Sequence, residues 1–164
     1  MTGQVVQINV SRGGLPKRSI SRGVVTPLGL EGDLCAHPEF HGGPRQALLL
    51  IAAETVDELA GGGFPVFYGA LGENITTRGI DRRQLRVGHQ LRLGTALIEL
   101  TKVRVPCATL DVYGPGIQRH IYDKQVKEGD ADSPRWGKSG FYASVLEPGE
   151  VYPDDRVELV SVLA

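Results

Sequence analysis

The sequence predicts a mainly β fold that closes, or nearly closes, into a barrel with a few short helices. Its 164 residues include 22 glycines and 10 prolines without a periodic repeat, which is typical of many turns. Between those turns we count roughly seven to nine short apolar segments and two helical ones. A sheet of such strands must protect its edges, and closure does so. The length fits one domain over residues 1–164.

The first strands are expected near the N-terminus. Gln4–Val10 alternates, with Val6, Ile8 and Val10 on one side, as in a half-buried strand. Arg18–Val25 repeats this alternation and predicts a second strand.

A long irregular loop is expected next, over residues 29–46, which are rich in Gly, Pro and His and lack periodicity. Loops of that length in compact domains are usually functional or disordered. The apolar run Ala47–Ile51 predicts a buried strand. Ala52–Ala60 changes to a helical period with an acidic outer face, and the glycines at 61–63 end it.

The second half of the chain predicts further strands, one weakly amphipathic helix over Ile117–Glu128 and a polar loop over residues 129–139. The expected strands lie around Asn74–Thr77, Gln90–Leu93, Ala96–Val105, Phe141–Leu146 and Arg156–Val160.

Composition disfavours several functions. The net charge is −1 and no basic run exceeds a pair, so binding to nucleic acid or to a membrane surface is not expected. The N-terminus lacks the pattern of a secretory signal, and no apolar run is long enough to span a membrane, which predicts a cytoplasmic protein. Cys35 and Cys107, 72 positions apart, are then expected to be free thiols.

Cys107 is the sharpest candidate for chemistry. Pro106 cannot donate to a strand ladder, so the strand should end before it and leave the thiol beside a cleft. Lys102 and Arg104 lie close by, and cations favour the thiolate, which is both a nucleophile and a soft metal ligand. Cysteine also packs often as a small buried hydrophobe. The residues alone leave both interpretations open.

A second cluster reads Cys35-x-His37-x3-His41. A structural zinc site would need a fourth ligand, for which Asp33 is available, but the surrounding Pro and Gly argue against a helix that would align the histidines. The sequence favours a loop-shaping role for His41. Gly42 and Gly43, followed by Arg45, could also present backbone amides to an anion, although Gly-Gly is more often a simple turn.

A third group, residues 72–78, combines a carboxylate, an amide, hydroxyls and a guanidinium in Glu73, Asn74, Thr76 and Arg78. Taken alone, this combination of residues is typical of a polar turn that leads into a strand.

The order of these motifs resembles the MOSC family, named for the C-terminal domain of molybdenum cofactor sulfurases, and its small bacterial stand-alone members in particular. The likeness extends over roughly residues 3–161. Its motifs are "GLEGD", "HGGP", "GALGENITT", "VGHQLRLGTALIELT", "RVPC" and "SGFYASVLEPGEV".

The resemblance implies a β-barrel whose Cys107 thiolate ligates molybdenum beside the sulfurs of molybdopterin, or carries a transferable sulfur. It places His41, Gly42, Gly43, Glu73 and Asn74 at the cofactor pocket. Beside them we expect four further cofactor-binding residues, since the pterin carries a phosphate: Arg45, Thr76, Arg78 and Arg104. Cys35 and His37 depart from the family's usual first loop.

The implied function is that of a molybdenum-cofactor oxidoreductase that reduces small N-hydroxylated substrates. Electrons would come from a separate donor protein, because two cysteines are too few for an iron–sulfur cluster. One alternative is a sulfur-carrier or cofactor-delivery protein, supplied by a separate pyridoxal-phosphate desulfurase. Another is a non-catalytic binding module. Pairing of two copies through an edge strand stays open.

Overall fold

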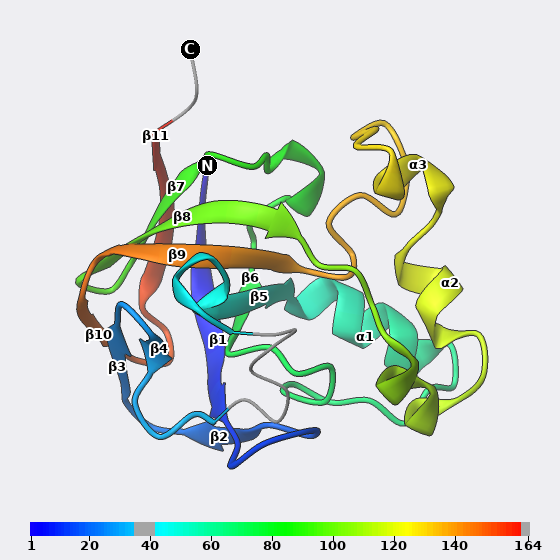
Figure 1. The fold of residues 1–164 in the computed structure, drawn as a ribbon, viewed down its shortest axis with the longest axis horizontal. Helices are drawn as coiled ribbons and strands as arrows, with labels where there is room; N and C mark the ends of the chain where they lie inside the picture. Colours follow the sequence, from blue (N-terminus) through cyan, green and yellow to red (C-terminus); the bar gives the residue numbers. More distant parts are fainter. Residues whose placement is uncertain (35–41, 162–164) are drawn as a thin grey trace.

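The computed structural model describes residues 1–34 and 42–161, and its main feature is a closed barrel of seven strands (Figure 1). The expected mainly β fold is confirmed. Every neighbouring pair is antiparallel except β5 and β6, which helix α1 connects. Parallel neighbours need such a crossover. The order around the barrel is β11 (Arg156–Ser161), β7 (Gln90–Leu93), β8 (Ala96–Val103), β9 (Phe141–Glu147), β5 (Leu48–Ala52), β6 (Ile75–Arg78) and β1 (Thr2–Val10), which pairs again with β11.

A small second sheet explains why the expected strand Arg18–Val25 is wrong as one element. Its first part, β2 (Arg18–Ile20), pairs with β1. The chain then leaves the barrel, and β3 (Gly23–Thr26) lies between β10 (Gly149–Val151) and β4 (Gly29–Leu30). The predicted face of Ile20 and Val24 does not continue across the break, because Val25, not Val24, is the buried valine of β3.

Strand β1 also departs from its predicted pattern. Its pairing with β6 shifts register between Val5 and Gln7, as at a β-bulge. Val5 and Ile8 are therefore the fully buried apolar residues, whereas Val6 and Val10 are only partly buried. Ile8 and Val10 pack against the same apolar cluster, as predicted, whereas the prediction that Val6 shares their face is wrong for this reason.

Strand β5 separates two apolar clusters. Leu48 and Leu50 belong to the cluster inside the barrel, whereas Leu49 and Ile51 pack in a second cluster with residues of helix α1 (Ala53–Gly61). Side chains alternate between the two faces of a strand, so apolar residues at every position reflect burial on both faces. This confirms the predicted buried strand and the helix after it.

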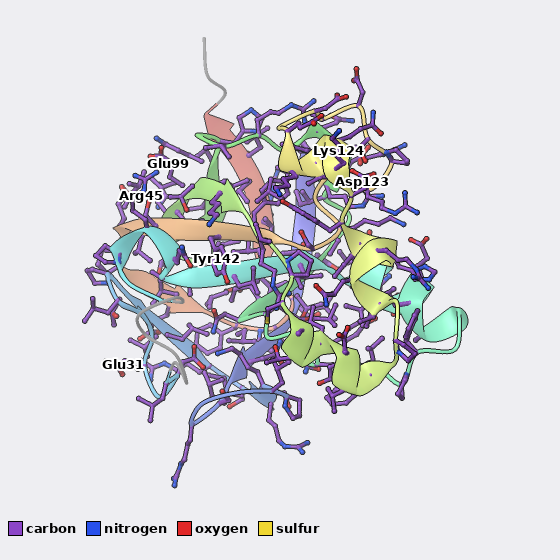
Figure 2. All side chains as sticks on the ribbon, turned by 45° about the vertical axis from the view of Figure 1, so that its right-hand side comes forward. Glu31, Arg45, Glu99, Asp123, Lys124 and Tyr142 are labelled. Carbon is purple, nitrogen blue, oxygen red and sulfur yellow. The ribbon has the colours of Figure 1, made fainter. Side chains whose placement is uncertain are left out.

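The remaining helices are short, and α2, α3 and η3 lie with α1 on one side of the barrel (Figure 1). The single helix expected over residues 117–128 is wrong. Tyr122 is extended, and Asp123 starts a new helix by accepting the backbone N–H of Val126 at 2.8 Å. Figure 2 shows Asp123 and Lys124 at this start. The helices are α2 (Ile117–Ile121), α3 (Lys124–Lys127) and the 3₁₀ helices η1 (Pro44–Gln46), η2 (Arg82–Gln84) and η3 (Ala108–Tyr113).

No helix among the described residues is long and apolar enough to cross a membrane.

Candidate functional site

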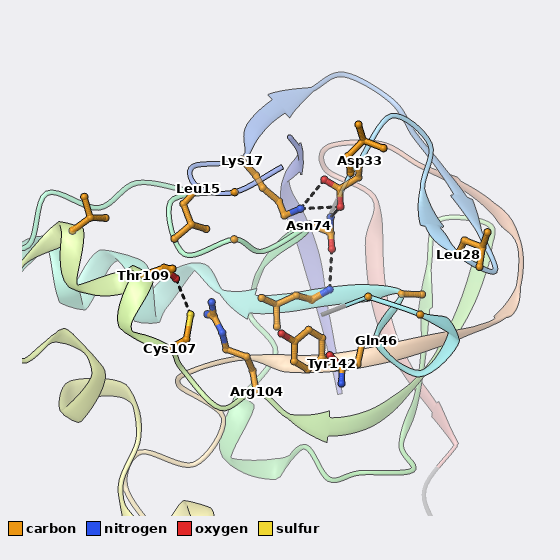
Figure 3. Close-up of a pocket in the computed structure, with 18 residues that line it drawn as sticks. Leu15, Lys17, Leu28, Asp33, Gln46, Asn74, Arg104, Cys107, Thr109 and Tyr142 are labelled. Atoms are coloured by element: carbon orange, nitrogen blue, oxygen red, sulfur yellow. Dashed lines mark hydrogen bonds and ion pairs between the residues drawn. The ribbon is translucent and has the colours of Figure 1, made fainter. Parts of the chain in front are cut away.

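A pocket of about 540 Å³ lies beside the barrel wall (Figure 3). Segments far apart in the sequence form it: the β1–β2 connection, the β3–β4 turn, residues around 33 and 42–47, strands β5 and β9, and the chain before β6 and after β8. Cofactor and substrate sites commonly have volumes of roughly 300–1,000 Å³.

Cys107 lines this pocket and is not enclosed by aliphatic neighbours. Strand β8 ends at Val103, and Cys107 stands at the start of η3 after Pro106. The thiol is free and partly exposed, and its Sγ lies 2.7 Å from Thr109 Oγ1, which also lines the pocket. The predicted position of the thiol beside a cleft is confirmed.

Arg104 places a buried cation in the pocket wall. Its side chain is 5% exposed, and it donates to the carbonyl oxygens of Leu71 at 2.8 Å and Ser139 at 3.5 Å. Burial lowers the pKa of the guanidinium, while Tyr142, Cys107 and Glu73 act in the opposite direction by charge. Negative charge on Cys107 therefore stabilises the charged form of Arg104.

Asn74 faces the pocket and joins three segments. Its side-chain oxygen accepts the backbone N–H of Leu49 at 3.0 Å, and its nitrogen donates to Asp33 at 2.9 Å and to the Asn9 carbonyl at 3.3 Å. The amide is thus bonded on both ends, and it fixes the shape of this wall.

Glu73 and Thr76 lie behind the pocket wall and are fully buried. Thr76 Oγ1 donates to Glu73 Oε2 at 3.1 Å, and Glu73 Oε1 has no hydrogen-bond partner among the described residues. Burial raises the pKa of the Glu73 carboxyl, while nearby backbone amides, the Thr76 hydroxyl and Arg104 oppose the shift. Neither residue is among those that line the pocket.

An ion pair that the sequence did not indicate completes the pocket. Lys17 Nζ lies 2.6 and 2.8 Å from the two carboxylate oxygens of Asp33 (Figure 3). Asp33 also accepts the backbone N–H of Ser11 at 2.9 Å. The glycine-rich turn before Lys17 indicates that the chain bends there. It does not indicate that Lys17 pairs with Asp33, 16 residues further along the chain.

The comparisons with known proteins agree with this architecture. The model of the MOSC domain matches residues 37–158. The chain belongs to the MOSC family. It is 34% identical to protein YiiM of Escherichia coli over 146 residues, 84% of this chain and 59% of that protein. It is 33% identical to YflK of Bacillus subtilis, an uncharacterized protein, over 80% of this chain and 55% of that protein.

Solved structures show the same MOSC fold. The crystal structure of YiiM from Escherichia coli matches with a TM-score of 0.72 and 28% identity, covering 100% of this chain and 72% of that one. YiiM from Geobacillus stearothermophilus matches with a TM-score of 0.73 and 25% identity, covering 97% and 75%. The chain spans under two thirds of the length of the two curated relatives above.

Five of the expected site residues, from three separate stretches of the sequence, line one pocket: Gly42, Gly43, Asn74, Arg104 and Cys107. Gly42 and Gly43 have φ of 85° and 86°, a conformation that favours glycine. His41 lies outside the described residues, as do Cys35 and His37, so the structure does not test the zinc alternative.

Two expected arginines lie elsewhere. Arg78 is exposed and its guanidinium contacts Asp57 at 3.0 Å and the Tyr68 hydroxyl at 2.6 Å. Arg45 is exposed at the surface of the molecule (Figure 2), and its backbone carbonyl accepts the Thr101 hydroxyl. Neither lines the pocket.

Proposed function

We propose that this protein binds a molybdenum cofactor in the pocket, with the Cys107 thiolate as the protein's ligand to the metal. The observation that supports this best is a free, partly exposed thiol in the wall of a pocket of about 540 Å³, three positions from a buried arginine. Soft thiolates suit metals that are also bound by sulfur.

The residues present fit such a group. The described part of the chain contains no cluster of three or more His, Cys, Asp or Glu that could hold a metal alone. A thiolate such as that of Cys107 suits a metal whose other donors are sulfurs of an organic cofactor. The polar wall at Asn74 and Lys17 and the cation at Arg104 suit a pterin that carries a phosphate.

The activity that we propose is reduction of an N-hydroxylated compound. The N–O bond takes up two electrons and two protons, which gives N–H and one water. The cofactor, when bound, supplies the two-electron redox chemistry. A separate electron-donor protein supplies the electrons. Within this chain, Cys107 holds the metal, Thr109 orients its sulfur, and Arg104 balances negative charge beside it.

A second candidate uses the same thiol as a persulfide. Its support is the partial exposure of Cys107, which leaves the sulfur accessible to a donor protein. In this role the protein carries sulfur or delivers the cofactor and needs no bound metal. A binding module without chemistry is the third outcome.

One purification distinguishes these functions. The protein is produced in cells that make molybdopterin, and molybdenum, released pterin and sulfane sulfur are measured for wild type, Cys107→Ser and Cys35→Ser. We expect wild type and Cys35→Ser to retain metal and pterin, and Cys107→Ser to lose the metal by at least about tenfold while staying folded, because the swap changes little volume.

Sulfane sulfur on Cys107 without metal contradicts the first function and supports the sulfur carrier. Folded wild-type protein that holds neither contradicts both. A large fall in melting temperature for Cys107→Ser would show that the thiol serves packing.

A further inference from the structure

The mouth of the pocket carries the most exposed large apolar side chains of the described chain. Leu28 is 78% exposed, Val112 75% and Leu34 58%, and no other large apolar residue within 1–34 and 42–161 reaches these values. All three line this one pocket. Apolar residues scattered singly over a surface need no explanation, but their convergence on one cavity indicates a ligand.

These residues come from separate parts of the fold. Leu28 lies in the turn between β3 and β4, Leu34 follows β4, and Val112 belongs to η3. Figure 3 shows Leu28 at the end of the pocket opposite Cys107. Local sequence therefore does not account for the grouping, which arises only when the barrel brings the segments together.

The geometry of η3 places Val112 near the thiol. Residues three apart in a 3₁₀ helix lie on the same side, and Thr109 and Val112 both line the pocket. Leu110 and Tyr113, the pair one position further on, belong instead to the apolar cluster around α1. Val112 thus lies one turn from Thr109, whose hydroxyl contacts Cys107 Sγ at 2.7 Å.

Polar groups occupy the deeper part of the same pocket. Arg104 and Asn74 are 5% and 4% exposed, whereas the three apolar side chains at the mouth are mostly in solvent. With the cofactor of the proposed function held by these deep polar groups, the apolar mouth is the part of the pocket left for the body of a substrate.

Building on the proposed function, we propose that the substrate is an N-hydroxylated compound carried on an extended apolar body, which Leu28, Leu34 and Val112 contact. A small molecule suits this mouth better than a protein, because a protein seated on these residues would close the route to Cys107. The apolar group next to the reacting nitrogen then provides affinity at the mouth, while the deep polar groups hold the cofactor that reduces the N–OH.

The test uses straight-chain amidoximes from acetamidoxime to octanamidoxime. Dissociation constants are measured by calorimetry on the protein as purified, and KM and kcat are measured with a chemical reductant. We expect the dissociation constant to fall about fourfold per methylene until the chain passes the mouth. Leu28→Gln and Val112→Asn should reduce this dependence to about twofold per methylene.

Leu146→Gln and Val87→Asn are the controls, because both are exposed apolar residues, at 43% and 44%, that do not line the pocket. They should keep the wild-type dependence on chain length. Affinity that is independent of chain length overturns the inference, as does a dependence that Leu28→Gln and Val112→Asn share with the controls.

The two proposals fail differently. Turnover of acetamidoxime without any effect of chain length contradicts the apolar substrate and leaves the reductase in place. Chain-length-dependent binding without turnover, in protein that carries molybdenum and pterin, contradicts the reductase and leaves the apolar mouth in place.

Discussion

Two cations line the same pocket, and their charges are balanced in different ways. Lys17 contacts both oxygens of Asp33, and the side chains of that pair are 13% and 16% exposed. Arg104 is buried more deeply, yet it donates only to two neutral carbonyls and forms no ion pair with a carboxylate of the described residues. Tyr142, Cys107 and Glu73 are the groups whose charge raises the pKa of Arg104 against the effect of burial.

The difference indicates separate roles. The Lys17–Asp33 pair, with Asn74 and the Ser11 amide, joins the β1–β2 connection to the chain after β4 and to the chain before β6. The charge of Lys17 is therefore neutralised by a carboxylate of the fold itself. A buried cation without a carboxylate is unfavourable unless an anion approaches. Arg104 is thus the group whose charge is left for a thiolate or an anionic ligand.

The largest expected effect is on Arg104. Arg104→Met removes the donors of two buried carbonyls, at Leu71 and Ser139, which we expect to destabilise the protein by about 2–3 kcal/mol. It should also lower pterin retention by at least about tenfold, since a charged hydrogen bond is lost. Urea unfolding and pterin content measure the two effects.

Arg104→Lys is the control, because it keeps the charge but reaches fewer acceptors. It should retain more pterin than Arg104→Met. A Met variant more stable than wild type would show that desolvation of the guanidinium outweighs its hydrogen bonds. Equal pterin loss in both variants would assign the effect to shape instead of charge.

The next largest effect is a dependence of stability on pH that arises from Glu73. Burial raises its pKa above the ordinary 4.5, so the folded state holds this proton more tightly than the unfolded state does. The resulting stability is fully present below about pH 4.5 and is lost as pH rises through the folded-state pKa. The free energy of unfolding then falls with pH by at most about 1.4 kcal/mol per pH unit, the limit for one proton.

Glu73→Gln should remove this pH dependence because the amide cannot ionise. Stability is compared by urea unfolding between acidic and neutral pH, with the exposed Glu31→Gln as the control for a lost surface charge. An unchanged pH dependence in Glu73→Gln would mean that Glu73 is ionised throughout and is the counterion of Arg104. The contrast between the two cations would then disappear.

The sequence predicted those parts of the fold and site that depend on local patterns. Alternation and turn residues indicate the strands, and Pro106 alone indicates that Cys107 follows a strand end. The bulge in β1 was missed because a register shift depends on the partner strand, β6. The burial of the polar Asn9, on the opposite face from Ile8, also depends on distant residues, since it donates to the Glu73 carbonyl.

Long-range pairing limits such predictions within the site. Arg78 follows Glu73 and Asn74 closely in the chain, yet it pairs with Asp57 and Tyr68 on the outside. The Lys17–Asp33 pair was missed for the converse reason, because its two members come from separate connections. Chain proximity does not show which way a side chain points once a strand alternates.

The smallest expected effect is the coupling between Lys17 and Asp33, which tests whether this ion pair is stable in solution. In a double-mutant cycle with Lys17→Met and Asp33→Asn, we expect a coupling free energy of about 1 kcal/mol that changes little with salt, because the pair is shielded. The exposed pair Arg92–Glu147 is the reference and should couple by less than about 0.5 kcal/mol. Urea unfolding at low and high salt gives both values. If Lys17 and Asp33 couple no more strongly than the reference pair, Lys17 is as free as Arg104 to bind an anionic ligand. The pocket would then hold two available cations.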